Sequence, residues 1–469
     1  MKVALINTNR MQPPIAPIGL DYVAEALHSA GHTVRILDLC WEDEPESALP
    51  VFFSDCEFGL VGITLRNTDD CVYTSRASFL PGFIDVVKAV RAHSGAPILL
   101  GGVGFSTMPE QVLALAGADY GVRGDGEFSM PALASLLEQR SDVSDLPNLV
   151  LHQKGQWRRN PLHSADLATL PVMRRTWIDN RRYFREGGQA GFETKRGCSG
   201  SCIYCADPVA KGRHVRMRPP ADVVDEIEAL LSQGIDHLHT CDGEFNIDEE
   251  HAAQVCREII RRGIHEKIQW YAYCSPAPFT RELAGLMSEA GCAGIDFGVD
   301  NGSREMLRRL GRNFAPEDIV RATRWSREAG MTVMLDLLLG APGESKVSVT
   351  ETVNLMKMAD PDRVGVSLGV RVYPGTPLAG TFERGKPAAG LTGGKDPVEP
   401  VFFMEPDIRE EVFNWMHDLT GDDERFLFYD PNRPRRNYNY NDNQRLVDAI
   451  REGHRGAYWD ILRKISAQS

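Results

Sequence analysis

The stretch TKRGCSGSCIYCADP, residues 194–208, places three cysteines within eight residues. Cys198, Cys202 and Cys205 follow a predicted strand with the spacing C-x-x-x-C-x-x-C. These thiols cannot all point into an apolar core, whereas a loop containing Gly197 and Gly200 can turn them toward one point. Three cysteines leave a four-iron cluster one protein ligand short, which opens one iron to an outside ligand. The spacing therefore predicts a catalytic [4Fe–4S] cluster.

A structural zinc site is the alternative for the same cysteines. Zinc sites usually pair C-x-x-C units with a fourth ligand at a distance. His214 follows the loop and is a candidate for that ligand.

Strands and helices alternate from the cysteine loop onward. Each expected strand is a short apolar run followed by an amphipathic helix: GFETKRG, HLHTCD, IQWYAY, AGIDFGV, TVMLDLLL and RVGVSLGVRVY. Such a series is typical of an α/β barrel, and we expect a partial (β/α)6 barrel over residues 188–376. Catalytic groups of α/β barrels lie at the C-terminal ends of the strands, and the cysteine loop follows the first of them.

The cysteine loop, with the aromatic Tyr204 before its third cysteine, resembles the signature of the radical S-adenosylmethionine (SAM) enzymes. Further segments resemble that superfamily's motifs in the expected order: CDGEFN (241–246), FGVDNGS (297–303), LLLGAPGES (337–345) and YPGTPL (373–378). The resemblance implies that the cluster binds SAM and cleaves it reductively to a 5′-deoxyadenosyl radical.

The same motifs imply which residues contact SAM. A carboxylate at Glu244 or Asp242 suits the methionine ammonium group, and one at Asp300 suits the ribose hydroxyls. Asp242 stands where the family has Gly and Asp300 where it has Glu, and an Asp after a strand is also a common helix N-cap. The implied contacts are Tyr204, Asp242, Gly243, Glu244, Asp300, Ser303, Gly340 and Pro342.

Residues 1–140 form a separate alternating series. VALIN, HTVRILDL, LVGITL and APILLGG are expected strands of an open parallel sheet, a doubly wound Rossmann-like domain. Such sheets bind ligands outside the carboxyl ends of their strands. PPIAPIGLDYVAEALHSAGHTVRILD, ILLGGVGFSTMPEQVL and GADYGVRGDGE resemble the cobalamin-binding domain fused to one large radical SAM subfamily. The implied cobalamin contacts are Thr64, Leu65, Arg66, Gly101, Gly102, Gly124 and Glu127.

No histidine is placed to ligate cobalt from below. The segment Asp-x-His-x-x-Gly is absent, and His28 lies inside a predicted helix. Arg66 is a candidate for the lower face of cobalamin. In having an Arg there, the chain resembles the radical SAM tryptophan 2-methyltransferases. A guanidinium cannot coordinate a metal. The alternative is that Arg66 pairs with Asp69 or Asp70 at the surface.

The remaining segments are a linker over residues 141–187 and an α-rich C-terminal cap over 377–469, ending in one helix over Gln444–Lys464. We expect a solvated basic loop after the cysteines, with anion or acidic-reductase binding as the alternative (Lys211, Arg213, Arg216, Arg218). Four further cysteines are expected mainly to pack in cores, although two of them lie near strand ends that face the site (Cys241, Cys274, Cys256, Cys292). Tyr271 and Tyr273 lie on a predicted strand, and each can contact a substrate only if its side chain points into the barrel.

Composition narrows the class of protein. The 469 residues are 42% hydrophobic with a net charge of −13 and no basic block, which argues against a nucleic-acid binder. No apolar run reaches the length of a membrane span, and MKVALINTN is too short for a signal-peptide core. Ten cysteines are too few for a disulfide scaffold of this length, so we expect reduced thiols and a cytoplasmic protein.

The function expected from these features is cobalamin-dependent C-methylation of a small natural-product substrate, with electrons from a flavodoxin, a ferredoxin or a dedicated reductase. One alternative is a radical SAM dehydratase of a diol or aminosugar whose cobalamin-like domain binds nothing. A tryptophan-type methylase would transfer the methyl group without hydrogen abstraction. A non-enzymatic cobalamin sensor is disfavoured, because a sensor needs no open iron.

Overall fold

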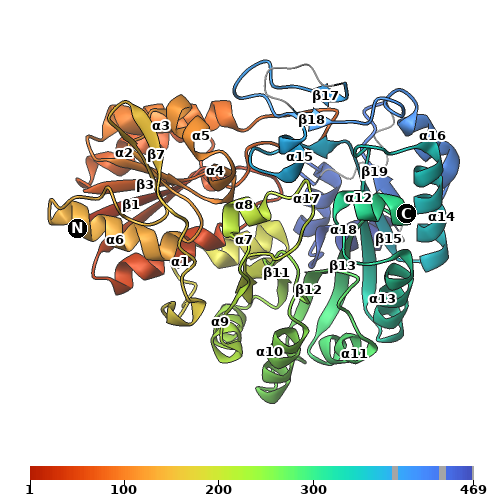
Figure 1. The fold of residues 1–469 in the computed structure, drawn as a ribbon. Helices are drawn as coiled ribbons and strands as arrows, with labels where there is room; N and C mark the ends of the chain where they lie inside the picture. The colour runs from red at the N-terminus through yellow and green to blue at the C-terminus, as the bar shows by residue number, and fades with distance from the viewer. Residues whose placement is uncertain (383–388, 433–439, 467–469) are drawn as a thin grey trace.

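The computed structural model describes residues 1–382, 389–432 and 440–466. Its two seven-stranded sheets, built mainly of parallel strands, lie side by side (Figure 1). The N-terminal sheet has the strand order β2-β1-β3-β4-β5-β6-β7. Its first five strands are parallel: β1 (Lys2–Asn7), β2 (Thr33–Asp38), β3 (Leu60–Thr64), β4 (Ile98–Gly101) and β5 (Tyr120–Val122). Helices cover both faces: α1 (Ile18–Ser29), α2 (Pro45–Ser54), α3 (Leu80–His93), α4 (Val103–Thr107), α5 (Pro109–Ala116) and α6 (Gly126–Glu138). The Rossmann-like prediction is confirmed.

The segment 141–187 contains strands that the sequence did not predict. β6 (Leu149–Gln153) and β7 (Gln156–Arg159) form a hairpin that adds to β5 in antiparallel orientation. Their pattern was hard to recognise because β7, QWRR, is exposed and polar at the edge of the sheet. After them come a 3-10 turn (Leu167–Thr169) and α7 (Asn180–Gly187).

The second sheet is the predicted barrel with one extra strand. All its strands are parallel, in the order β19-β15-β14-β13-β12-β11-β8. The strands are β8 (Ala190–Phe192), β11 (His237–Thr240), β12 (Gln269–Cys274), β13 (Cys292–Asp300), β14 (Thr332–Leu339), β15 (Arg363–Leu368) and β19 (Phe426–Phe428). Their outer side packs on α9 (Pro220–Ser232), α10 (Glu249–Arg261), α11 (Arg281–Glu289), α12 (Arg304–Leu310), α13 (Pro316–Glu328) and α14 (Lys346–Ala359). β19 comes from the expected cap, so the C-terminal region completes the sheet as well as covering it.

The predicted last helix is two helices, α17 (Gln444–Arg451) and α18 (Tyr458–Ser466). Gly453 and Gly456 adopt positive φ angles of 103° and 118° between them, which an α-helix cannot continue through. The break directs Ala457 and Trp459 into the barrel, where they contact Tyr271 and Met334. The C-terminal end of the chain therefore fills one end of the barrel interior.

Short elements complete the described chain. They are the 3-10 helix Leu39–Trp41, β9 (Lys195–Arg196), α8 (Asp207–Lys211), β10 (Arg216–Met217), β16 (Val370–Arg371), α15 (Pro377–Gly380), β17 (Leu391–Thr392), β18 (Phe402–Phe403) and α16 (Val412–Thr420). Among the described residues, no helix combines the length and the apolarity needed to cross a membrane.

Candidate functional site

A cavity of about 720 Å³ lies between the two sheets and is lined by both. The N-terminal domain lines it with apolar residues of the sheet and α6, including Leu5, Ile63, Leu99, Val122 and Met130. The barrel lines it with inward-facing residues and with the start of the CDGEFN motif, including His239, Cys241, Gly243 and Tyr273. The C-terminal segment adds Tyr440, Ala457, Tyr458 and Trp459. A volume of this size suits a large organic cofactor together with part of a substrate.

The cysteine loop turns as its glycines predict. Gly197 has a φ of 92°, and a Cβ there would lie 2.2 Å from the His214 carbonyl oxygen. A Cβ on Gly200 would lie 3.2 Å from Cys198 Sγ and 3.9 Å from Cys202 Sγ, so these two sulfurs face the same small space. The Gly200 N–H donates to Cys198 Sγ at 3.4 Å. The loop therefore gathers the thiols and supplies a backbone donor to them.

Burial raises the pKa of all three thiols, that of Cys205 to about 12; neighbouring thiols raise the pKa of Cys198 and Cys205 further, whereas Arg312 lowers that of Cys202. Bound iron would replace these protons, since metal ligation needs the thiolate. Among the described residues, no three His, Cys, Asp or Glu side chains lie close enough to bind a single metal ion. In a four-iron cluster each cysteine ligates a different iron, so the three thiols need not converge on a single metal ion.

Arg312 is a site residue that the sequence did not reveal. Its Nη1 donates to Cys202 Sγ at 3.0 Å and its Nη2 to the Gly298 carbonyl at 2.6 Å. The same guanidinium lies 3.4 Å from Glu244 Oε1 and 3.4 Å from Asp300 Oδ2. One buried cation thus joins a cluster ligand to two carboxylates of the SAM motifs.

The two carboxylates of CDGEFN have different environments. Asp242 Oδ1 accepts from the Thr194 N–H at 2.8 Å, and Oδ2 accepts from the Thr194 hydroxyl at 2.5 Å. Lys195 Nζ lies 3.4 Å from Asp242 Oδ2 as well. Asp242 therefore holds the strand before the cysteine loop, although it borders the cavity. Glu244, with a pKa raised by burial, is the carboxylate beside Arg312 and the cysteines.

Asp300 ends β13 at a register shift with a φ of 61°, and accepts from the Tyr204 hydroxyl at 2.6 Å. It is not a helix N-cap, because Ser303 occupies that position for α12. The backbone N–H of Ser303 donates to Asn301 Oδ1 at 2.9 Å, and the Asn301 amide donates to Glu344 Oε2 at 3.0 Å. Tyr204 and Asp300 thus meet directly, and their contacts with SAM stay predictions.

Gly340 and Pro342 lie away from the cavity. Gly340 has a φ of 99°, and a Cβ there would lie 2.4 Å from Met404 Sδ. Its carbonyl accepts from the Glu405 N–H at 2.9 Å. This turn packs on the C-terminal segment, and its proposed adenine contact stays a prediction.

In the N-terminal domain the cavity is lined by all but one of the residues predicted to contact cobalamin: Thr64, Arg66, Gly101, Gly102, Gly124 and Glu127. Leu65 is the exception, since its side chain is buried in the sheet core. Gly102 has a φ of 102°, and a Cβ there would lie 2.4 Å from the Leu65 carbonyl oxygen. Glu127 is also bound to the barrel domain, because Arg196 Nη2 lies 2.9 Å from it.

Arg66 faces the cavity, and the alternative pairing with Asp69 or Asp70 is not formed. Asp69 pairs with Arg371 at 2.8 Å, and Asp70 accepts from the Val72 N–H at 3.1 Å. Arg66 Nη1 instead contacts Met11 Sδ at 3.8 Å. Its charge acts on Tyr273 and Tyr458, lowering the pKa of both phenols against the larger effect of burial.

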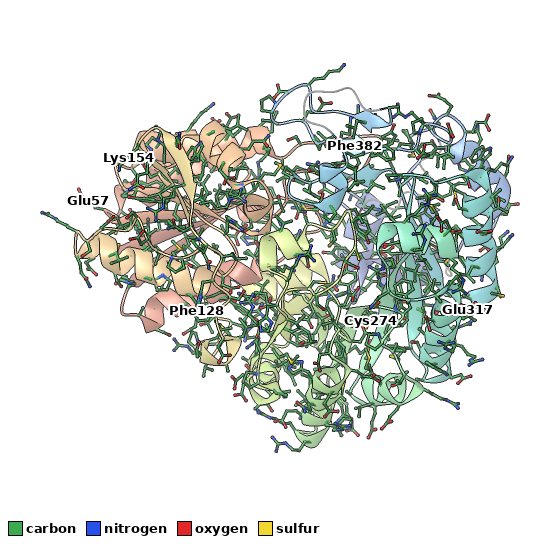
Figure 2. All side chains as sticks on the ribbon, viewed as in Figure 1. Glu57, Phe128, Lys154, Cys274, Glu317 and Phe382 are labelled. Carbon is green, nitrogen blue, oxygen red and sulfur yellow. The ribbon has the colours of Figure 1, made fainter. Side chains whose placement is uncertain are left out.

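Of the basic loop, Lys211 lines the cavity and pairs with Asp207 at 3.1 Å. Arg216 and Arg218 are buried in ion pairs with Asp125 and Glu226, so the expected solvated loop is wrong for them. Arg213 is exposed. Cys241 borders the cavity, whereas three cysteines pack in the barrel core, one of them labelled in Figure 2: Cys256, Cys274 and Cys292.

Both domains match known protein families. Residues 192–356 match the radical SAM superfamily, and residues 5–134 match the B12 binding domain. A tryptophan 2-C-methyltransferase from Streptomyces laurentii is 35% identical over 440 residues, covering 80% of this chain and 74% of that protein.

Solved structures agree with these matches. The radical SAM methyltransferase TsrM from Kitasatospora setae, with tryptophan and a SAM analogue bound, superposes with a TM-score of 0.91 at 30% identity, covering 100% of this chain and 99% of that one. A second TsrM structure, with cobalamin and a [4Fe–4S] cluster bound, gives 0.90 at 29% identity, with 99% and 98% coverage. The cobalamin-dependent radical SAM enzyme OxsB shares the fold, with a TM-score of 0.74 at 15% identity, covering 89% of this chain and 66% of that one.

Proposed function

The chain belongs to the cobalamin-dependent radical SAM methyltransferases, and from this premise we propose that it methylates a carbon of tryptophan or of a closely related indole amino acid. Its cofactors are a [4Fe–4S] cluster, SAM and cobalamin. The observation that carries the proposal is the cavity of about 720 Å³, which joins the N-terminal strand ends to the barrel interior and is walled there by Tyr273, Tyr458 and Trp459. Aromatic walls suit a planar indole ring.

The open cavity disfavours the dehydratase alternative. A cobalamin-like domain that bound nothing would gain stability by filling this space with side chains. Instead Gly101 and Gly102 leave the strand ends bare, and the cavity reaches the apolar interior of the sheet. This shape suits a bound cofactor with a flat ring and an extended tail.

When bound, cobalamin carries the methyl group that is transferred. This chain's residues hold the partners in place and keep water out. Cys198, Cys202 and Cys205 bind the cluster, and Glu244 with Arg312 can hold the charged methionine end of SAM. Arg66 lines the cavity, and a guanidinium cannot coordinate cobalt.

The reaction route follows from the tryptophan-type relative. For that type we expect methyl transfer without hydrogen abstraction, and the 35% identity over 80% of the chain supports this route here. We further propose that a flavodoxin-type, ferredoxin-type or dedicated reductase keeps the cofactors active, and that the protein works in the cytoplasm.

Anaerobic reconstitution with iron, sulfide and hydroxocobalamin tests the proposal. We expect the chain to retain cobalamin through gel filtration and, with SAM and tryptophan, to form S-adenosylhomocysteine with little 5′-deoxyadenosine. No retained cobalamin, with 5′-deoxyadenosine as the sole SAM product, would favour the dehydratase. Cys205→Ala is the matched control, since it should lose cluster absorbance and SAM turnover but keep cobalamin.

A further inference from the structure

Two aspartates lie inside the barrel on neighbouring strands, next to a residue of the cavity wall. Asp296 of β13 stands opposite Tyr273 of β12, and Asp336 of β14 stands opposite Gly298, two residues farther along β13. Side chains alternate between the faces of a strand. The residues flanking the aspartates, such as Ile295 and Leu335, belong to the outer core, so the aspartates point into the barrel.

The position of Gly294 confirms this direction. It has the same parity along β13 as Asp296, and a Cβ built on it would lie 2.9 Å from the Trp459 ring inside the barrel. Tyr273 is 43% exposed although it lies in a central strand, because its side chain opens into the cavity. The pair therefore lies directly behind Tyr273, which lines the cavity, although the two aspartates are not themselves lining residues.

Asp296 is only 3% exposed, and its Oδ1 has no hydrogen-bond partner among the described residues. Burial, the neighbouring charge of Asp336 and a side-chain hydrogen bond with Asp336 all raise the pKa of Asp296. Among the described residues Asp296 forms no ion pair, and no group of three His, Cys, Asp or Glu side chains is close enough together there to bind a metal ion. A buried carboxylate oxygen without a donor costs free energy unless a ligand supplies one.

We propose that Asp296 and Asp336 bind the ammonium group of an amino-acid substrate inside the barrel. The assignment rests on the proposed function and names the contact that would orient its substrate. An ammonium offers three donors and one positive charge, which matches a carboxylate pair better than a neutral N–H does. The Tyr273 ring beside the pair can add a cation–π contact.

Binding measurements on the reconstituted holoenzyme test this assignment. Calorimetry under anaerobic conditions would compare L-tryptophan and tryptamine, which carry the ammonium, with indole-3-propionate, which lacks it. We expect the wild-type chain to bind the two amines about tenfold or more tightly than indole-3-propionate. In Asp296→Asn this preference should fall below about twofold, with binding of indole-3-propionate unchanged.

Thermal unfolding without substrate gives a second readout. Because burial and Asp336 oppose the charged form of Asp296, and the neutral amide of Asp296→Asn has no charged form, we expect the variant to unfold at a higher temperature than wild type. An aspartate that only supported the fold would give the opposite shift. Asp85→Asn, at an exposed position on α3, is the matched control and should change neither measurement.

Three results would overturn the assignment: no amine preference in wild type, an unchanged preference in Asp296→Asn, or loss of folding in both Asp296→Asn and Asp336→Asn. Methylation of tryptophan without an amine preference would refute this assignment alone. An amine preference without methylation would refute the proposed function alone.

Discussion

Arg312 connects the cysteine loop to the carboxylates that face it. Its N–H···S bond to Cys202 should stabilise the reduced, more negative cluster. We predict that Arg312→Gln lowers the cluster's reduction potential by about 60 mV, the one-electron equivalent of roughly 1.4 kcal/mol. A redox titration followed by electron paramagnetic resonance measures this shift. Arg308→Gln, exposed on the neighbouring helix, is the control, and equal potentials in all three proteins would contradict the role given to Arg312.

Glu344 should make stability depend on pH. Burial raises its pKa from 4.5 to about 7 in the folded chain. Between these values the folded state holds the proton more tightly than the unfolded state, so stability is full below pH 4.5 and falls as the pH rises through 7. Relative to Glu344→Gln, we predict that wild type loses roughly 3 kcal/mol over that range. Parallel thermal unfolding curves across pH for the two proteins would refute this.

At the residue scale the sequence predicted groups that chemistry and local spacing define. The cysteine triad, Glu244 and Asp300 fall in short motifs at strand ends. Arg312 and Trp459 were missed, because each reaches the site through a long-range contact that no local pattern encodes. Asp242 is predicted to contact SAM from its place in a motif and its charge, and its oxygens also accept from Thr194 and lie near Lys195.

At the element scale, the cysteine loop depends on Gly197. Alanine there would meet both an unfavourable φ of 92° and the His214 carbonyl 2.2 Å away. We predict that Gly197→Ala binds markedly less iron after reconstitution but retains cobalamin, since the N-terminal domain is untouched. Iron and cobalt analysis checks this. Gly234→Ala, with a φ of 82° and open space around it, should bind iron as wild type does.

Strands and helices with a clear hydrophobic periodicity could be predicted from the sequence, and those without it could not. The buried parallel strands read as apolar runs between amphipathic helices, so both sheets were foreseen. β7 and β19 were missed, because one is polar at an edge and the other joins the barrel from the C-terminal region. The last helix was predicted too long, because its hydrophobic pattern resumes after Gly453 and Gly456.

At the scale of the whole molecule, a buried ion network joins the two domains. Arg175 contacts Asp21 of α1 at 2.9 Å and Glu226 of α9 at 2.7 Å. Removing the guanidinium would leave both carboxylates buried without it, so we predict that Arg175→Ala costs about 3–5 kcal/mol of stability. Denaturant unfolding of the two proteins measures the loss.

The neighbouring Arg174→Ala supplies the control. Arg174 pairs with Glu25 but is 55% exposed, so its loss should cost under about 1 kcal/mol. Equal destabilisation by the two substitutions would show that the network does not hold the domains together.

The cavity is formed by both domains together, and the sequence predicted only the separate part that each domain contributes. Each domain's motifs predicted a cofactor at its own strand ends, but only the folded chain shows that both sets of strand ends open into one space. Transfer of a methyl group between the two cofactor modules and a substrate requires this arrangement, and a sensor or a support domain does not.

Methyl transfer within this space is the central claim. The most direct measurement supplies the reconstituted holoenzyme with SAM that carries a trideuterated methyl group and with L-tryptophan, and identifies the product by mass spectrometry and nuclear magnetic resonance. We predict a trideuteriomethyl group on an indole carbon, formed only when cobalamin is present. Unlabelled tryptophan recovered while SAM is consumed, or equal methylation without cobalamin, would contradict the account.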